Sequence, residues 1–254
     1  QTRHAWSGAA KTVAFEGYRS IALDLRGHGE SDWAADGDYS LEAIARDLIE
    51  VGEHVARGGT RPHVVGASLG GLAAIVAAGM LSRDAFESVT LVDITPNMDA
   101  AGVTKVVGFM GAHVHEGFDS LEQAADVIAT YLPHRPRPKD LEGLRKNLRQ
   151  GEDGRWRWHW DPAFITGVMR RSGVAHTGDL EQAVRDIRVP LHLIRGRMSE
   201  LVSEDSVAAF RSLAPQAHYT DVAGARHMVA GDRNDVFIEA VVSFLRTIRE
   251  QTPV

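Results

Sequence analysis

The stretch Pro62–Met80 reads PHVVGASLGGLAAIVAAGM and decides the fold of the chain. Residues 63–65 form a short β-branched run behind a proline, which is typical of a buried strand. Residues 69–81 are densely apolar and rich in alanine and leucine, which is typical of a buried helix. Between them lies GASLG, a G-x-S-x-G sequence in a strand–turn–helix setting. The stretch therefore predicts a serine nucleophile at Ser68, exposed on a tight turn.

The spacing within the turn has a physical reason. Gly66 and Gly70, two residues before and after the serine, remove side chains that would collide there. The following helix directs free N–H groups at the same spot, so the amide of Leu69 is the candidate donor to an oxyanion. A simpler interpretation stays open at this point: a glycine-rich turn whose serine only caps the helix.

Strand and helix patterns alternate on both sides of this stretch. The predicted strands are apolar runs at 20–25, 88–94, 190–194 and 218–222, and the predicted helices lie at 6–15, 40–56, 180–187, 206–213 and 235–249. Such alternation predicts an α/β fold with a mostly parallel sheet flanked by helices. In such sheets the functional loops follow the carboxyl ends of the strands.

The pattern changes between residues 97 and 177. Helical segments at 103–114, 120–132 and 141–150 follow one another there without a convincing strand. We expect this part to form a helical cap over the strand ends. The predicted organisation is a first core part at 1–96, a helical cap at 97–178 and a second core part at 179–254.

The predicted cap is rich in aromatic residues. Residues 155–160 read RWRWHW and hold three of the five tryptophans. These and neighbouring large side chains either line a substrate pocket or pack between cap helices, and packing is favoured. The residues concerned are Trp156, Trp158, His159, Trp160, Phe109 and Met169.

The partners of Ser68 are expected on loops after later strands. A serine hydroxyl needs a base within hydrogen-bond reach and a third group that orients the base. His227 follows the last predicted strand and a glycine-containing loop, which makes it the candidate base. Glu200, in the loop after the preceding strand, is the preferred acid. Asp93, at the carboxyl end of the strand at 88–94, is the alternative acid.

Composition excludes several classes of function. The chain has 254 residues and a formal net charge of −6, and such a negative charge argues against nucleic-acid binding. It has no cysteine, so we expect neither a disulfide nor a thiolate metal site. No apolar run reaches the length of a membrane span. His113 and His115 lack an evident third ligand, and no metal or cofactor is expected. We expect a cytoplasmic protein whose partner is a small-molecule substrate, with a homodimer left open.

Four motifs together resemble the capped, serine-nucleophile branch of the α/β-hydrolase superfamily. They are GASLGG at 66–71, DLRGHGESD at 24–32, RG followed by SE at 195–200, and GARH at 224–227. Epoxide hydrolases and haloalkane dehalogenases resemble this branch too, but they have an aspartate where this chain has Ser68. The resemblance implies ester or lactone hydrolysis through an acyl-enzyme, with Ser68, His227 and an acid as the triad.

Other activities are compatible with the same triad. A hydrolase that cleaves a C–C bond is the closest alternative, and a cofactor-free haloperoxidase or perhydrolase is another. A ligand receptor without catalysis is less favoured. The resemblance also implies further strands upstream, including one whose loop supplies a second oxyanion donor. We therefore expect the native protein to carry residues before Gln1 that this sequence lacks.

Overall fold

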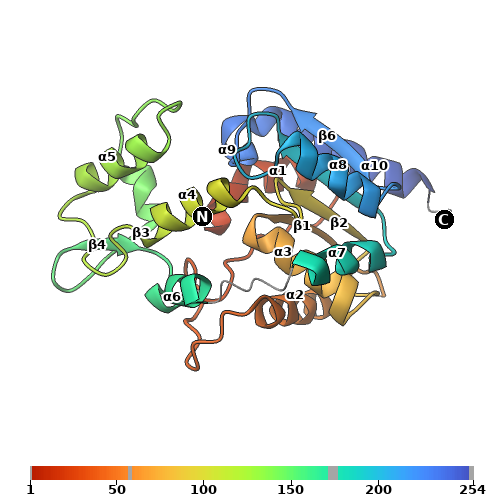
Figure 1. The fold of residues 1–254 in the computed structure, drawn as a ribbon, viewed down its shortest axis with the longest axis horizontal. Helices are drawn as coiled ribbons and strands as arrows, with labels where there is room; N and C mark the ends of the chain where they lie inside the picture. Colours follow the sequence, from red (N-terminus) through yellow and green to blue (C-terminus); the bar gives the residue numbers. More distant parts are fainter. Residues whose placement is uncertain (1, 57–58, 171–176, 252–254) are drawn as a thin grey trace. The chain divides into compact units, whose positions relative to one another are not determined.

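The computed structural model describes residues 2–56, 59–170 and 177–251 (Figure 1). The chain divides into two compact units, which are described separately. The first, here called the hairpin unit, comprises Gln1–Ser7, Ala22–Tyr39 and Thr104–Ser172. The second, here called the sheet unit, comprises Gly8–Ile21, Ser40–Val103 and Gly173–Val254. This division differs from the three parts expected from the sequence, which remain a prediction.

The sheet unit is built on four parallel strands in the order β1-β2-β5-β6, as far as the described residues show. The inner strands β2 (Ser88–Val92) and β5 (Leu191–Gly196) are buried along their whole length. Both inner strands are buried on two faces, as expected of a parallel sheet with helices on either side. The outer strands are β1 (His63–Ala67) and β6 (His218–Val222). The predicted α/β class is confirmed.

The helices of the sheet unit agree with their sequence patterns. Ser40 caps α2 (Leu41–Val55) by accepting a hydrogen bond from the amide of Ala43. The apolar face of the last helix, α10 (Asn234–Gln251), is buried and contacts β6 (Figure 1). The remaining helices are α1 (Ser7–Phe15), α3 (Leu69–Val76) with a π-helical continuation at Ala77–Leu81, α7 (Thr177–Asp186), α8 (Glu204–Leu213) and α9 (Val229–Asp232).

The hairpin unit contains a pair of antiparallel strands that the sequence did not predict. Strands β3 (Leu148–Gln150) and β4 (Trp156–Trp158) pair with Leu148 opposite Trp158. The expected helix at 141–150 is wrong, because only a 3₁₀ turn at Glu142–Lys146 forms before β3. Trp156 and Trp158 are buried on either side of the more exposed Arg157, which is the period of a strand.

Among the described residues three helices contribute to the hairpin unit; the first two lie close to the helices expected at 103–114 and 120–132, and the third was not predicted. They are α4 (Ala100–Gly111), whose first residues belong to the sheet unit, α5 (Leu121–Tyr131) and α6 (Pro162–Arg170). A short 3₁₀ turn, Arg3–Trp6, precedes α1. No helix in the described ranges combines the length and apolar character that crossing a membrane requires.

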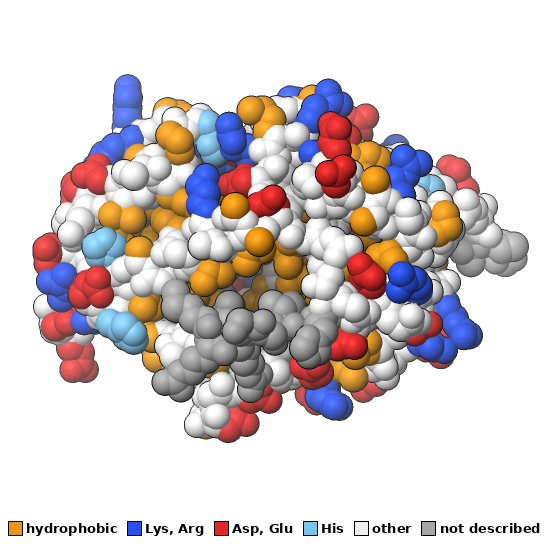
Figure 2. Space-filling view, viewed as in Figure 1, with side chains coloured by type: hydrophobic (Ala, Val, Ile, Leu, Met, Phe, Trp, Pro, Cys, Tyr) orange, Lys and Arg blue, Asp and Glu red, His pale blue; other side chains and the backbone are white. Residues whose placement is uncertain are grey.

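The predicted strand at 20–25 does not form. No residue in the described part of the chain pairs with it, and Ile21 and Leu23 are 45% and 38% exposed. Strand backbone is stable only where a neighbouring strand satisfies its N–H and C=O groups. The apolar run therefore forms no strand in the described structure. On the face shown in Figure 2, acidic and basic side chains are interspersed rather than gathered by sign.

Candidate active site

Ser68 lies on a strained turn between β1 and α3. Its backbone has φ 49° and ψ −119°, a conformation that residues other than glycine rarely adopt. The turn is held by backbone hydrogen bonds: the Ser68 amide donates to the Val92 carbonyl at 3.3 Å, and the Ser68 carbonyl accepts from Gly71 and Leu72 at 2.9 and 3.0 Å. The sheet and the first turn of α3 together fix the serine at the carboxyl end of β1.

Two glycines make this turn sterically accessible. A Cβ on Gly66 would lie 2.4 Å from the Gly70 carbonyl oxygen, and a Cβ on Gly71 would lie 2.4 Å from Cγ2 of Ile94. A Cβ on Gly70 would meet nothing within 4 Å. The expectation that Gly70 prevents a collision is therefore wrong. The second close approach falls at Gly71, where α3 packs against the residue that follows Asp93.

Gly66→Ala and Gly70→Ala form a matched pair that tests this packing. We expect Gly66→Ala to lower the free energy of unfolding by about 1–3 kcal/mol, because the new methyl group meets backbone that has no room to move. Gly70→Ala should be neutral or slightly stabilising, since alanine favours a helix. Urea denaturation of both variants measures the difference. Equal losses in the two would contradict the account of the turn.

Asp93 is a fully buried carboxylate at the carboxyl end of β2. Its backbone also has positive φ, at 51°, and its amide donates to the Ile194 carbonyl at 2.7 Å. Oδ1 accepts a hydrogen bond from the amide of Gly196 at 2.9 Å, and Oδ2 accepts from the Ser199 hydroxyl at 2.5 Å. A buried carboxylate is stable only with such partners.

The third partner of this carboxylate is His227, on the loop after β6. Its Nδ1 lies 2.9 Å from Oδ2 of Asp93, and its side chain is 12% exposed. Because a carboxylate accepts hydrogen bonds, Nδ1 carries the proton of the neutral ring, and Nε2 is left as a base. Within the described ranges the Ser68 hydroxyl makes no hydrogen bond. The contact between Ser68 and His227 therefore stays a prediction.

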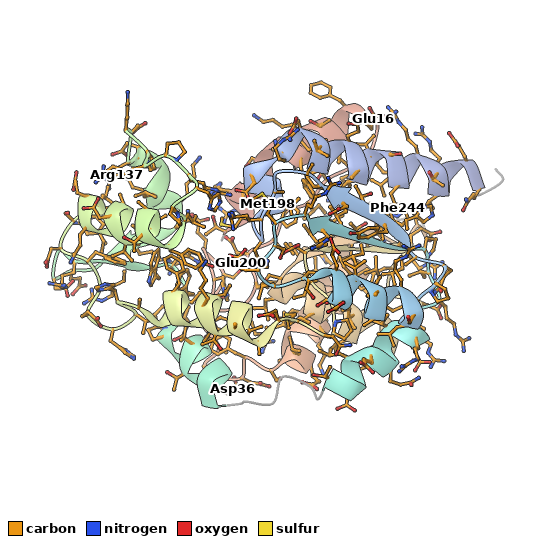
Figure 3. All side chains as sticks on the ribbon, turned by 45° about the horizontal axis from the view of Figure 1, so that its top comes forward. Glu16, Asp36, Arg137, Met198, Glu200 and Phe244 are labelled. Atoms are coloured by element: carbon orange, nitrogen blue, oxygen red, sulfur yellow. The ribbon has the colours of Figure 1, made fainter. Side chains whose placement is uncertain are left out.

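Of the two candidate acids, Asp93 rather than the preferred Glu200 contacts His227. Glu200 lies on the loop after β5, as expected (Figure 3), but His227 donates its Nδ1 hydrogen bond to Asp93. β2 lies between β1 and β5 in the sheet, and the side chain at its end contacts the loop that carries Glu200 through Ser199. The backbone of Glu200 packs closely against α4 at Gly102. A Cβ on Gly102 would lie 2.0 Å from the Glu200 carbonyl oxygen.

The amide of Leu69 is the remaining predicted component of this site. Leu69 is the first residue of α3, where backbone N–H groups have no partner within the helix. Its role as an oxyanion donor remains a prediction. In the described part of the chain, no three His, Asp or Glu side chains are grouped as a metal ion would require.

The aromatic residues considered for a pocket lie in the hairpin unit and are mostly buried. Trp156, Trp158 and Trp160 are 5–8% exposed. Trp158 donates its indole N–H to the Ala112 carbonyl at 2.9 Å and stacks on Trp160, with ring centres 4.8 Å apart. Phe109 stacks on Tyr131 at 3.9 Å. These contacts give the aromatic residues a packing role, and contact with a substrate stays a prediction.

Two further residues of that group need separate mention. His159 is 2% exposed and accepts a hydrogen bond at Nδ1 from the amide of Gly29, 2.8 Å away. Burial lowers the pKa of His159 to about 2, so its ring is neutral in the folded protein. Met169 belongs to α6, but its side chain lies outside the described residues.

Buried histidines in both units predict a loss of stability in acid. Burial lowers the pKa values of His28 and His192 from the ordinary 6.5 to about 4. Between these values the unfolded chain binds more protons than the folded chain. The free energy of unfolding should therefore fall as the pH drops from about 6.5 to about 4, by up to ~1.4 kcal/mol per pH unit for each such histidine.

Urea denaturation between pH 7.5 and 4.5 measures this slope. His192→Gln keeps a partner for the Thr220 hydroxyl, which lies 2.9 Å from Nε2 of His192, but removes the titrating group. We expect this variant to have a shallower slope than the unchanged protein. His115→Gln, at an exposed position, is the control. An unchanged slope in His192→Gln would contradict the assignment.

Comparison with known proteins agrees with the α/β fold. The sequence profile described as "alpha/beta hydrolase fold" matches residues 1–233. Esterase Rv0045c from Mycobacterium tuberculosis is 29% identical over 254 residues, which cover 97% of this chain and 80% of that protein. A 2-(acetamidomethylene)succinate hydrolase from Mesorhizobium japonicum is 30% identical over 230 residues, which cover 90% of this chain and 78% of that protein.

Solved structures give the same result. A structure of the M. tuberculosis esterase Rv0045c has a TM-score of 0.73 at 29% identity and covers 97% of this chain and 82% of its own. A structure of E-2-(acetamidomethylene)succinate hydrolase has a TM-score of 0.74 at 25% identity and covers 94% of this chain and 87% of its own. The relatives named as esterases and hydrolases support an enzyme with hydrolase activity.

Proposed function

The chain belongs to the α/β-hydrolase family, and from this premise we propose that it is a serine hydrolase that cleaves a small-molecule ester or lactone. The observation that carries the proposal is the hydrogen bond from Nδ1 of His227 to the buried carboxylate of Asp93. It leaves Nε2 as a base in the same unit as the strained turn of Ser68. The proposed triad is Ser68, His227 and Asp93.

In the proposed mechanism the Ser68 hydroxyl attacks the carbonyl carbon while Nε2 of His227 takes its proton. The oxygen of the tetrahedral intermediate becomes negative, and the Leu69 amide is the donor that stabilises it. Asp93 holds the ring and stabilises the imidazolium. When the intermediate collapses, His227 gives the proton to the departing alkoxide, and the acyl group stays on Ser68.

The second half of the reaction repeats these steps with water. His227 takes a proton from a water molecule, which attacks the acyl carbon. The tetrahedral intermediate then breaks at the serine oxygen, which recovers its proton from His227. The products are a carboxylic acid and the free enzyme. This chemistry uses side chains of this chain, a backbone amide and water.

Cleavage of a bond other than an ester is the second candidate function. The likeness to a 2-(acetamidomethylene)succinate hydrolase favours it, because that relative is named for a substituted succinate rather than for an ester. Hydrolysis of a C–C bond in a β-diketone would use the same three groups. These alternatives differ in the leaving group, so substrates separate them.

The test is a panel of p-nitrophenyl esters of increasing acyl length, with lactones, 2-(acetamidomethylene)succinate and a β-diketone assayed beside them. We expect hydrolysis of short esters or lactones, and the preferred chain length would define the substrate class. Peroxide-dependent halogenation of monochlorodimedone would favour a haloperoxidase instead. Failure to turn over any member of the panel, together with tight binding of one, would favour a receptor and contradict the proposal.

A further inference from the structure

The loop that follows β5 presents Ser199 to the buried carboxylate. The Ser199 hydroxyl oxygen lies 3.0 Å from the amide of Leu201 and 3.1 Å from the amide of Val202, and it accepts a hydrogen bond from each. Its third contact is Oδ2 of Asp93 at 2.5 Å. Because both amides can only donate, the hydroxyl proton goes to the carboxylate. The direction of this hydrogen bond follows from its partners.

Ser199 and His227 share one oxygen atom. Oδ2 of Asp93 accepts from both, while Oδ1 accepts from the amide of Gly196. One donor from the end of β5 (Gly196) and one from the loop after it (Ser199) therefore hold the two oxygens, which restricts rotation of the carboxylate about its Cβ–Cγ bond. Without the Ser199 hydroxyl, only His227 would hold Oδ2, and the carboxylate would have more freedom to turn away from the ring.

Arg195 binds the far end of this loop. This arginine is 5% exposed, and its Nε donates to the Val202 carbonyl at 2.7 Å. Arg197, two residues further on, pairs through Nε with Asp221 of β6 at 2.8 Å. Ser199 lies between these two attachments. Its hydroxyl is therefore presented to Asp93 from a fixed backbone rather than from a free loop.

We propose that Ser199 is a positioning residue, whose hydroxyl holds the carboxylate of Asp93 in the orientation that aligns His227. This inference rests on the proposed function for its kinetic consequence, but the hydrogen-bond arrangement can be tested without it. Since Ser199 would act through Asp93 and not on the substrate, its loss should lower kcat and leave KM almost unchanged. Loss of a hydrogen bond to a charged group predicts a fall of about 10- to 100-fold.

Ser199→Ala and Ser203→Ala form the matched pair. Ser203 lies four residues further along the same loop and caps α8 by accepting from the amide of Ser206 at 3.1 Å. Both changes remove a hydroxyl that accepts backbone hydrogen bonds, so both should lower the melting temperature. Only Ser199→Ala should lower kcat for the best p-nitrophenyl ester. Equal kcat values for folded Ser199→Ala and the unchanged protein would overturn the proposal.

A proton NMR measurement tests the same contact without substrate. The Nδ1 proton of His227, hydrogen-bonded to Asp93, should give a downfield resonance that His227→Gln abolishes. In Ser199→Ala the carboxylate is freer to turn away from the ring, which weakens its hydrogen bond with Nδ1, so the resonance should move upfield. In Ser203→Ala it should not move. An unmoved resonance in folded Ser199→Ala would also overturn the proposal.

Ser199→Cys is the second variant if Ser199→Ala does not fold. A thiol has nearly the same shape and donates more weakly, so it should shift the resonance in the same direction by a smaller amount; no shift would overturn the proposal. The two measurements separate the two hypotheses. The resonance could move in Ser199→Ala while catalysis proves not to need Ser68. That result would defeat the proposed function but still support the positioning role of Ser199.

Discussion

Replacing Asp93 by asparagine is expected to lower kcat by about 10⁴-fold, with little change in KM. The amide of asparagine is neutral and can turn its NH₂ group toward the ring. His227 would then hold its proton on Nε2, where a base is needed, and the imidazolium formed during catalysis would lose its counter-charge. Steady-state kinetics on the best p-nitrophenyl ester measures the effect.

Glu200→Gln is the matched control for this change, because it too replaces a carboxylate by the amide of the same shape. Glu200 lies on a loop of the same site, but Asp93 is the carboxylate that accepts the hydrogen bond from His227. We therefore expect Glu200→Gln to keep most of the activity. A large loss in Glu200→Gln with a small one in Asp93→Asn would restore Glu200 as the acid and contradict the triad proposed here.

Replacing Ser68 by alanine is expected to have the largest effect, a loss in kcat on the order of 10⁶-fold. No acyl-enzyme can form, and His227 cannot compensate for the missing nucleophile. Alanine accepts the same strained backbone as serine, so the variant should fold with similar stability. Thermal unfolding checks this point, and Ser82→Ala, just beyond the π-helical end of the same helix, controls for loss of a serine. Substantial activity in folded Ser68→Ala would defeat the mechanism.

The serine turn could be predicted because its requirements are local. A strand, a tight turn and a helix lie within nineteen consecutive residues, Pro62–Met80, and only this order of residues satisfies all three. A Cβ on Gly66 would collide with the backbone of Gly70, four residues away, so the need for glycine at this position could be read from the motif. The collision that Gly71 avoids is with Ile94, two residues beyond the end of β2 and far along the sequence, and no local pattern shows it.

The acid could not be chosen from the sequence for the same reason. Asp93 lies at the carboxyl end of one predicted strand and Glu200 follows another, so both are expected at the same edge of the sheet. The choice depends on which side chain points at His227, and the carboxylate with three donors was visible only in the fold. Ser199 carried no signal of its own, since a serine in a polar loop is ordinary.

Strand pairing explains two differences between the predicted and observed secondary structure: one predicted strand that does not form and one strand that was not predicted. The run at 20–25 has strand composition, but no described neighbour pairs with it. The segment with Trp156 and Trp158 shows the alternation of a strand over only three residues. Such a short alternation becomes a strand because β3 pairs with it, which a search for longer periodic runs overlooks.

The most direct test of the central claim is labelling with a fluorophosphonate, followed by mass mapping of the modified peptide. A serine activated by His227 and Asp93 should carry the adduct at Ser68, the labelling should be much slower in Asp93→Asn, and Ser68→Ala should not react. An adduct on another residue, or labelling of Ser68 that proceeds equally fast in Asp93→Asn, would contradict the account.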